Sequence, residues 1–463
     1  MLKKYFCDKQ FNRRVLAVAL PIIVQNAITN FVSLLDNIMV GQVGTAQMSG
    51  VSIANNLIFV FNLCIFGGSA GAGIFIAQYH GSGDHQSIRH TFRFKFLLCL
   101  FLGILGCGLF YFGGDALIRL YLQGEGSAEE AALILSHGMD YLLVMLIGLV
   151  PFAMSNAYSS TLRECGQAVV PMTAGIAAVF VNLILNYILI FGHFGAPAMG
   201  VTGAAIATVV SRFVELAIIV IWTHTHSSRN PFIKGAFRSM YIPAPLAKRI
   251  AFKGMPLLIN EALWSGGEAM INLLYSTRGL DVVPAVNICS TIFNLSSVVV
   301  LSMGSTVGII MGQLQGAGHS RETLWDANHK LTAIAIAAGI LFGGMLASIS
   351  GLFPQLYNTT DSVRTLSAQM ILVCAIGLPA VGYVHAIYFT MRSGGKTWIT
   401  FLFDGGFSWL FIIPIAAVLC YLVDAPILAV YLFCRGIAYM VKCIMGYFML
   451  RRGTWIQNLT IKL

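Results

Sequence analysis

The 463-residue chain is 57% hydrophobic and only 10% charged. A soluble globular domain carries roughly a quarter charged residues, and a disordered chain combines high charge with few apolar residues, so the composition excludes both. A helix needs about 20 apolar residues to cross the hydrocarbon core of a bilayer. The formal net charge of +10 is therefore interpreted as a guide to membrane topology rather than as a sign of nucleic-acid binding.

Apolar stretches separated by polar or Gly/Pro-rich breaks predict about twelve transmembrane helices, the first of which is too long for a signal-peptide core. Their centres lie near residues 26, 60, 104, 146, 181, 211, 263, 297, 339, 377, 408 and 437. With both termini in the cytoplasm, the loops on the opposite side hold only Arg119, Arg278 and Arg364 among the basic residues. This asymmetry predicts a multi-pass protein of the plasma membrane with cytoplasmic termini.

An internal repeat relates the two halves of the chain at a constant offset of 235 residues, without gaps. The aligned identities include Arg14 with Arg249, Pro21 with Pro256, Asn37 with Asn272, Gly73 with Gly308, Gln78 with Gln313, and Gly81 with Gly316. Further along, an offset of 229 aligns Arg163 with Arg392. Six spans per half make the halves parallel repeats, an arrangement typical of alternating access around a site near the membrane midplane.

The predicted fold is therefore an all-α polytopic membrane protein with two six-helix lobes around a central cleft. We expect an N-terminal lobe at residues 1–228, a cytoplasmic linker at residues 229–248 and a C-terminal lobe at residues 249–463.

The first span carries polar side chains on one helical face, which is expected to point into the lobe or the cleft rather than toward lipid. These residues are Asn26, Asn30, Ser33 and Asn37. Asp36 lies about 80° around the helix from them, beside Gln25 and Thr29. Asp36 is interpreted either as a coupling group in a cavity or as a carboxylate solvated near the outer end of the span.

The seventh span carries Glu261 and Glu268, seven residues apart and therefore on one face. At the 235 offset they take the places of Asn26 and Ser33, so the same stripe is neutral in the first half and acidic in the second. Two carboxylates close together at low dielectric constant are not expected to stay ionised together, which would let one exchange a proton for a cation. The alternative is a solvated charge in a wet cleft.

Asp404 in the eleventh span is followed by Gly405 and Gly406, which permit close packing or a local break in the helix. Its equivalent in the first half is Gly175, so this acid is also peculiar to the second half. We weigh ion binding and structural pairing equally for Asp404.

The other intramembrane polar groups have more ordinary interpretations. Asn182 and Asn186 are one helical turn apart and either hold helices together or contribute to the Asp36 cavity. Arg212 and Glu215 are expected to form an ion pair. The remaining candidates are Arg435 and Lys442, which are expected to extend to the membrane surface, and His385, a candidate proton carrier whose simpler interpretation is a satisfied interior histidine.

Several motifs together resemble the multidrug and toxic compound extrusion (MATE) family, in its bacterial form. They are LLDNIMVGQVG around Asp36, IAQYHGSGD at the end of the second span, NLILNYILIFG at Asn182, NEALWS at Glu261 and MRSGGKT at Arg392. The resemblance covers essentially the whole chain. It implies export of organic cations or amphipathic compounds in exchange for Na⁺ or H⁺, with no other cofactor.

By that resemblance, Asp36 matches the first-helix acid that takes part in coupling, and Asn182 matches an amide of the same cavity. Glu261, beside Asn260, matches the acid of members that bind Na⁺ in the second lobe, so either Asp36 or Glu261 could hold Na⁺. Those members also use an acid in the tenth span, where this chain has GLPAVGYVHAIYFTMR, and Asp404 or Glu268 is the candidate substitute.

Two other functions are alternatives to a secondary antiporter. A flippase for lipid-linked precursors shares the architecture but would need a cationic cleft, whereas the buried charges here are predominantly acidic. A membrane enzyme is not expected, because no clustered metal ligands or nucleophile–base spacing is present. The expected partners are a small-molecule cationic or amphipathic substrate and membrane lipid, with no nucleic acid, and the chain is expected to act as a monomer.

Overall fold

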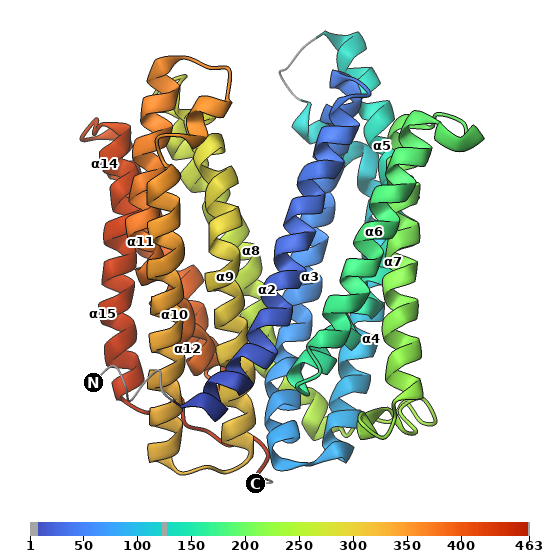
Figure 1. The fold of residues 1–463 in the computed structure, drawn as a ribbon, viewed down its shortest axis with the longest axis vertical. Helices are drawn as coiled ribbons and strands as arrows, with labels where there is room; N and C mark the ends of the chain where they lie inside the picture. Colours follow the sequence, from blue (N-terminus) through green and yellow to red (C-terminus); the bar gives the residue numbers. More distant parts are fainter. Residues whose placement is uncertain (1–7, 123–126, 462–463) are drawn as a thin grey trace. The chain divides into compact units, whose positions relative to one another are not determined.

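The structure, a computed structural model, describes residues 8–122 and 127–461, apart from the side chains of Ser33, Leu34 and Asn37. Within this part of the chain it is helical and contains no strand (Figure 1). The long helices are α2 (Lys9–Gly41), α3 (Thr45–Ser82), α4 (His85–Tyr121), α5 (Ala128–Glu164), α6 (Val169–Phe191), α7 (Gly200–Thr225), α8 (Ala244–Ser276), α9 (Val282–Gly316), α10 (Arg321–Ile349) and α11 (Asp361–Ser393).

The last two spans are built from shorter segments that include wide helical turns. The first consists of α12 (Thr397–Phe401), η4 (Leu402–Gly406), η5 (Ser408–Ile412) and α13 (Ile413–Tyr421), and the second of α14 (Ile427–Leu432), η6 (Phe433–Ile437) and α15 (Ala438–Arg451). The segments η4, η5 and η6 have the i→i+5 hydrogen bonding of a π-helix. Such segments are rare and occur often at functional sites.

Eleven helical spans in the described chain are long and apolar enough to cross a membrane. The helix α8 is also long, at 33 residues, but Asn260, Glu261 and Glu268 make it more polar than the others. The polytopic all-α membrane fold predicted from the sequence is therefore confirmed.

Several of these helices are preceded by a Ser or Thr N-cap, whose hydroxyl accepts a hydrogen bond from a backbone N–H of the first turn. Ser127 caps α5, Ser320 caps α10 and Thr360 caps α11. Each cap satisfies a donor that the helix itself cannot pair.

The described chain divides into two compact units. The N-terminal unit contains Val24–Ile76 and the described residues of His85–Gly254. The C-terminal unit contains Ala77–Asp84 and the described residues of Met1–Ile23 and Met255–Leu463. The first turns of α2 therefore pack in the C-terminal unit, and the first turns of α8 pack in the N-terminal unit. The division at residues 228 and 249 stays a prediction about the repeat.

In the N-terminal unit, α5 packs against α4 and α7, and α6 packs against α7. The segment that follows α7 is fixed to α4 by two arginines. Arg93 donates to the carbonyl oxygens of Ala236 (2.6 Å), Gly235 (2.8 Å) and Tyr241 (3.0 Å), and Arg89 donates to that of Phe232 (3.2 Å). This part of the predicted linker is thus an ordered element of the unit.

In the C-terminal unit, α9, α10 and α11 pack together and α15 packs against α11. The end of α3 crosses the end of α9 through glycines, because Gly81 lies against the Gln313 carbonyl and Gly316 lies against the Gln78 carbonyl. These four residues are the repeat partners at the 235 offset, so the contact is reciprocal. A larger side chain at either glycine would collide with the opposite backbone.

Candidate functional sites

A cavity of about 80 Å³ in the N-terminal unit contains Asp36. The Asp36 carboxylate comes from α2 and accepts a hydrogen bond of 2.6 Å from the Asn186 amide of α6. The same amide lies 3.2 Å from the Asn182 Oδ1, and the Asn182 amide donates to Thr208 of α7 at 3.2 Å. Asn182 lines the Asp36 cavity, and Asn186 binds the Asp36 carboxylate.

Gln25 lines the same cavity and packs against Gly175 of α6. Its Oε1 is buried and has no hydrogen-bond donor among the described residues. The cavity also contains Arg212, whose ion pair with Glu215 measures 3.4 Å, as expected from their spacing. This cavity thus combines one aspartate with amide and hydroxyl groups beside a neutral ion pair.

A cavity of about 250 Å³ in the C-terminal unit contains Glu261 and Asp404. The aromatic side chains of Trp264, Tyr388 and Phe389 and the guanidinium of Arg392 share its lining. Glu261 forms no ion pair within the described part of the chain. A carboxylate beside aromatic rings is an arrangement that attracts organic cations.

Asp404 lies in η4, and both of its carboxylate oxygens are bound. Lys442 of α15 donates to Oδ1 at 2.9 Å, and Asn260 of α8 donates to Oδ2 at 3.1 Å. The Asn260 Oδ1 accepts from the backbone N–H of Gly405 at 2.9 Å, a close approach that a side chain at position 405 would obstruct. The local break expected at the two glycines is therefore present as a π-helical segment.

Glu268 does not line this cavity. Instead, Arg435 of η6 binds its carboxylate with two hydrogen bonds of 2.6 and 3.1 Å. The expectation that Arg435 and Lys442 extend to the membrane surface is wrong, because each binds a carboxylate of another helix. The sequence did not identify these partners.

The remaining predicted site residues are one histidine of the C-terminal cavity and four polar side chains of the first span. His385 lines the C-terminal cavity, and its Nδ1 lies 3.0 Å from the Val381 carbonyl oxygen, consistent with a satisfied interior histidine. Asn26 is half-buried and Asn30 is exposed, and neither lines the Asp36 cavity. The side chains of Ser33 and Asn37 lie outside the described residues, so the polar stripe of the first span stays a prediction.

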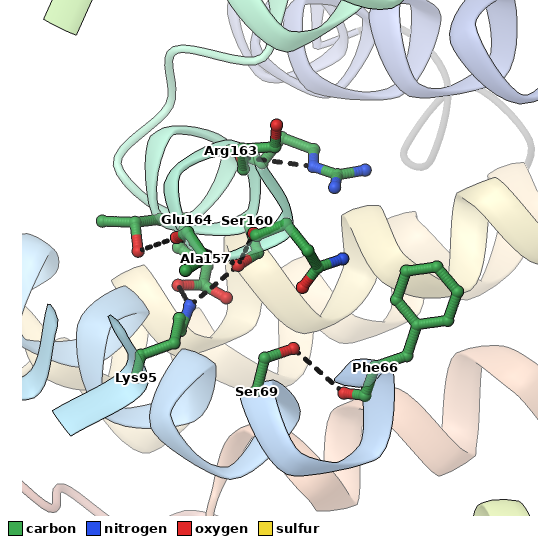
Figure 2. A network of polar contacts seen from close by, with 10 residues as sticks. Phe66, Ser69, Lys95, Ala157, Ser160, Arg163 and Glu164 are labelled. Atoms are coloured by element: carbon green, nitrogen blue, oxygen red, sulfur yellow. Dashed lines mark hydrogen bonds and ion pairs between the residues drawn. The ribbon is translucent and has the colours of Figure 1, made fainter. Parts of the chain in front are cut away.

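Sequence reasoning missed a buried ion pair in the N-terminal unit. Lys95 of α4, with no exposed surface, donates to the Glu164 carboxylate at 2.7 Å and to the Ser160 hydroxyl at 3.1 Å. Figure 2 shows the Lys95 ammonium directed toward both groups of α5. The available signal was the lysine between Phe94 and Phe96 in an apolar stretch, a setting in which a charge is normally paired.

The MatE family model matches this chain twice, at residues 21–188 and 256–422. The two matches begin at Pro21 and Pro256, which is the offset of the internal repeat. Together they cover most of the chain. The chain therefore belongs to the MATE family of membrane transporters and is not an enzyme.

The chain is similar to curated members of this family. It is 26% identical to the probable multidrug resistance protein NorM of Thermotoga maritima over 68% of this chain and 66% of that protein, just under two thirds of its length. It is 25% identical to the multidrug resistance protein MdtK of Cronobacter sakazakii over 81% of this chain and 79% of that protein. A transporter structure of the MOP superfamily from Pyrococcus furiosus has the same fold, with a TM-score of 0.85 at 19% identity over 96% of each chain.

Proposed function

We propose that this transporter exports organic cations or amphipathic drugs in exchange for Na⁺ or H⁺ by alternating access. The observation that carries the proposal is a carboxylate at membrane depth in each unit, Asp36 beside amides and hydroxyls and Glu261 beside aromatic rings. A charge at this depth is expensive and is normally retained for function. The relatives NorM and MdtK, both described as multidrug resistance proteins, support the same substrate class.

Exchange follows from competition for these carboxylates. An organic cation and the coupling ion are both attracted by a negative charge in a medium of low dielectric constant, so binding of one favours release of the other. If each orientation of the transporter binds only one of the two loads, the ion gradient drives export of the drug. No covalent step and no nucleotide are needed.

The orientation and the assembly are part of the same proposal. The basic residues favour cytoplasmic termini in a plasma membrane. We further propose that the chain acts as a monomer in lipid, without a nucleic-acid partner. A flippase for anionic lipid-linked precursors is the alternative, and the acidic character of Asp36 and Glu261 argues against it.

The test is efflux of a fluorescent organic cation from proteoliposomes at a clamped membrane potential, with a Na⁺ gradient, a pH gradient or neither. We expect efflux with one gradient and loss of efflux in Asp36→Asn and in Glu261→Gln. The matched control is Asp115→Asn, because Asp115 is exposed and, among the residues that the structure describes, pairs only with Arg119 on the same helix. Efflux that persists without either gradient would contradict exchange. Full gradient-driven efflux in Asp36→Asn or Glu261→Gln would show that the substituted carboxylate is not needed for coupling.

A further inference from the structure

The ammonium group of Lys442 occupies a site that resembles those of bound organic ammonium ions. The side chain is only 3% exposed, and its Nζ donates to the Asp404 carboxylate at 2.9 Å. The same atom lies 5.5 Å from the ring centroid of Phe407, 5.7 Å from that of Tyr439 and 5.9 Å from that of Phe403. A carboxylate and several aromatic rings around one cation are the usual elements of ammonium recognition.

The carboxylate in this site is held in a fixed orientation. Asn260 donates to its second oxygen, and the backbone N–H of Gly405 fixes Asn260 in turn. Asp404 and Phe403 also line the 250 Å³ cavity, whereas Lys442 does not. The carboxylate therefore lies between the lysine and a space that a small molecule could enter.

The fold does not require an ion pair at this position. In the N-terminal unit, the repeat equivalents of Asn260 and Asp404 are Gln25 and Gly175, which pack together without a charge. A buried ion pair is also weak support for stability, because removing two charges from water offsets much of their attraction. Packing alone thus does not explain why the C-terminal unit keeps both groups.

We propose that Asp404, Phe403, Phe407 and Tyr439 form a binding site for a primary ammonium group, which Lys442 occupies as a tethered cation. Its ammonium neutralises Asp404, whereas Glu261, the other carboxylate of the cavity, forms no ion pair among the described residues and shares the cavity with Arg392. Without the lysine, the site takes an alkylammonium ion from the cavity. The proposal does not rest on the transport function, because binding tests it.

The test uses the purified full-length protein and n-propylammonium, which corresponds to the lysine side chain beyond Cβ. In Lys442→Ala we expect the apparent melting temperature to fall by several degrees, because Asp404 loses its partner. Increasing n-propylammonium should restore the melting temperature with saturation. The neutral isostere 1-propanol should not, and n-propylammonium should raise the melting temperature of the wild-type protein much less, because Lys442 already occupies the site.

The double variant Lys442→Ala/Asp404→Asn is the matched control, because it keeps the cavity and removes the carboxylate. We expect its response to n-propylammonium to be no larger than that of the wild-type protein. An equal response in the single and double variants, or none in the single variant, would overturn the proposal. If Lys442→Ala cannot be purified folded, Lys442→Met/Asp404→Asn should be recovered because no charge is left unpaired, and its loss would show that packing rather than the ion site requires these residues.

Discussion

The two units hold their carboxylates in different ways. In the N-terminal unit the Asp36 carboxylate accepts a hydrogen bond from a neutral amide, that of Asn186. In the C-terminal unit Lys442 binds Asp404 and Arg435 binds Glu268. Glu261 forms no ion pair among the described residues and shares its cavity with the Arg392 guanidinium. The first cavity thus holds two acids, Asp36 and Glu215, of which Glu215 pairs with Arg212. Of the three acids compared in the C-terminal unit, Asp404 and Glu268 are paired with bases.

This difference shows how a duplicated fold can divide two tasks. An amide supports a carboxylate without fixing its charge, so the group can exchange its partner. An ammonium or guanidinium in hydrogen-bond contact is a permanent counter-ion. We therefore expect Asp36 and Glu261 to take part in exchange and the other two acids to be structural. The variants below test how the two units hold their charged groups.

The largest effect on stability is expected when the equivalent of Asp404 is introduced into the N-terminal cavity without an equivalent of Lys442 to pair with it. In Gly175→Asp the new side chain begins about 3.1 Å from the Gln25 amide nitrogen and adds a carboxylate with no lysine beside it. A buried charge without its partner destabilises a protein by about 3–5 kcal/mol. We expect a loss of that order in thermal unfolding of the purified protein.

Gly175→Ala is the control for this variant, because it adds the same Cβ without a charge and requires only a small shift of the Gln25 amide. It should cost much less. A stable Gly175→Asp protein would mean that Arg212, which lines the same cavity, leaves Glu215 to pair with the new acid.

The next effect tests the amide support of Asp36. Asn186→Ala removes the 2.6 Å hydrogen bond to the carboxylate. Hydrogen bonds to charged groups contribute about 1.5–3 kcal/mol, so we expect gradient-driven efflux to fall about tenfold or more in proteoliposomes. Asn182→Ala should be milder, since its contact is to the Asn186 amide. Equal losses would indicate that the amides support the packing of α6 rather than Asp36.

The sequence predicted the spans and the repeat, because these follow from hydropathy and from identity at a fixed offset. Of the residues expected around the first cavity, Gln25, Asp36 and Asn182 line it and Asn26 and Asn30 do not. The sequence did not predict the pairs of Asp404 with Lys442 or Glu268 with Arg435. Their partners are distant in the chain, and the π-helical segments η4 and η6 shift the face on which a residue lies. A period of 3.6 residues cannot anticipate that shift.

A smaller effect separates structure from coupling at Glu268. Glu268→Gln leaves Arg435 without its two charged hydrogen bonds, and because both side chains are partly exposed we expect a loss of only about 1–3 kcal/mol. Efflux by the folded protein should keep its ion dependence. A stable variant that has lost ion-driven efflux would instead indicate that Glu268 takes part in ion coupling, as its spacing from Glu261 predicts.

The smallest effect concerns a second pair of repeat equivalents, Lys95 and Lys330. Lys95 is buried with Glu164, whereas Lys330 binds Asp8 at 2.9 Å and Asp326 at 2.8 Å nearer the surface. The hydrogen bond from Lys330, together with that from the Phe11 backbone, lowers the pKa of Asp8 below its ordinary value. Because the pKa is lowered in the folded state, the stabilisation is present at neutral pH and is lost as the pH falls through that value.

Asp8→Asn should therefore lower the melting temperature slightly at pH 7, and the difference from wild type should shrink as the pH falls below about 4. The effect should be small, because Asp326 still binds Lys330 and exposed ion pairs contribute little. Glu164→Gln, at the buried equivalent, should cost more at pH 7, because it leaves the Lys95 ammonium enclosed without a carboxylate. If the two variants lowered the melting temperature equally, the burial of Lys95 would not distinguish the two units.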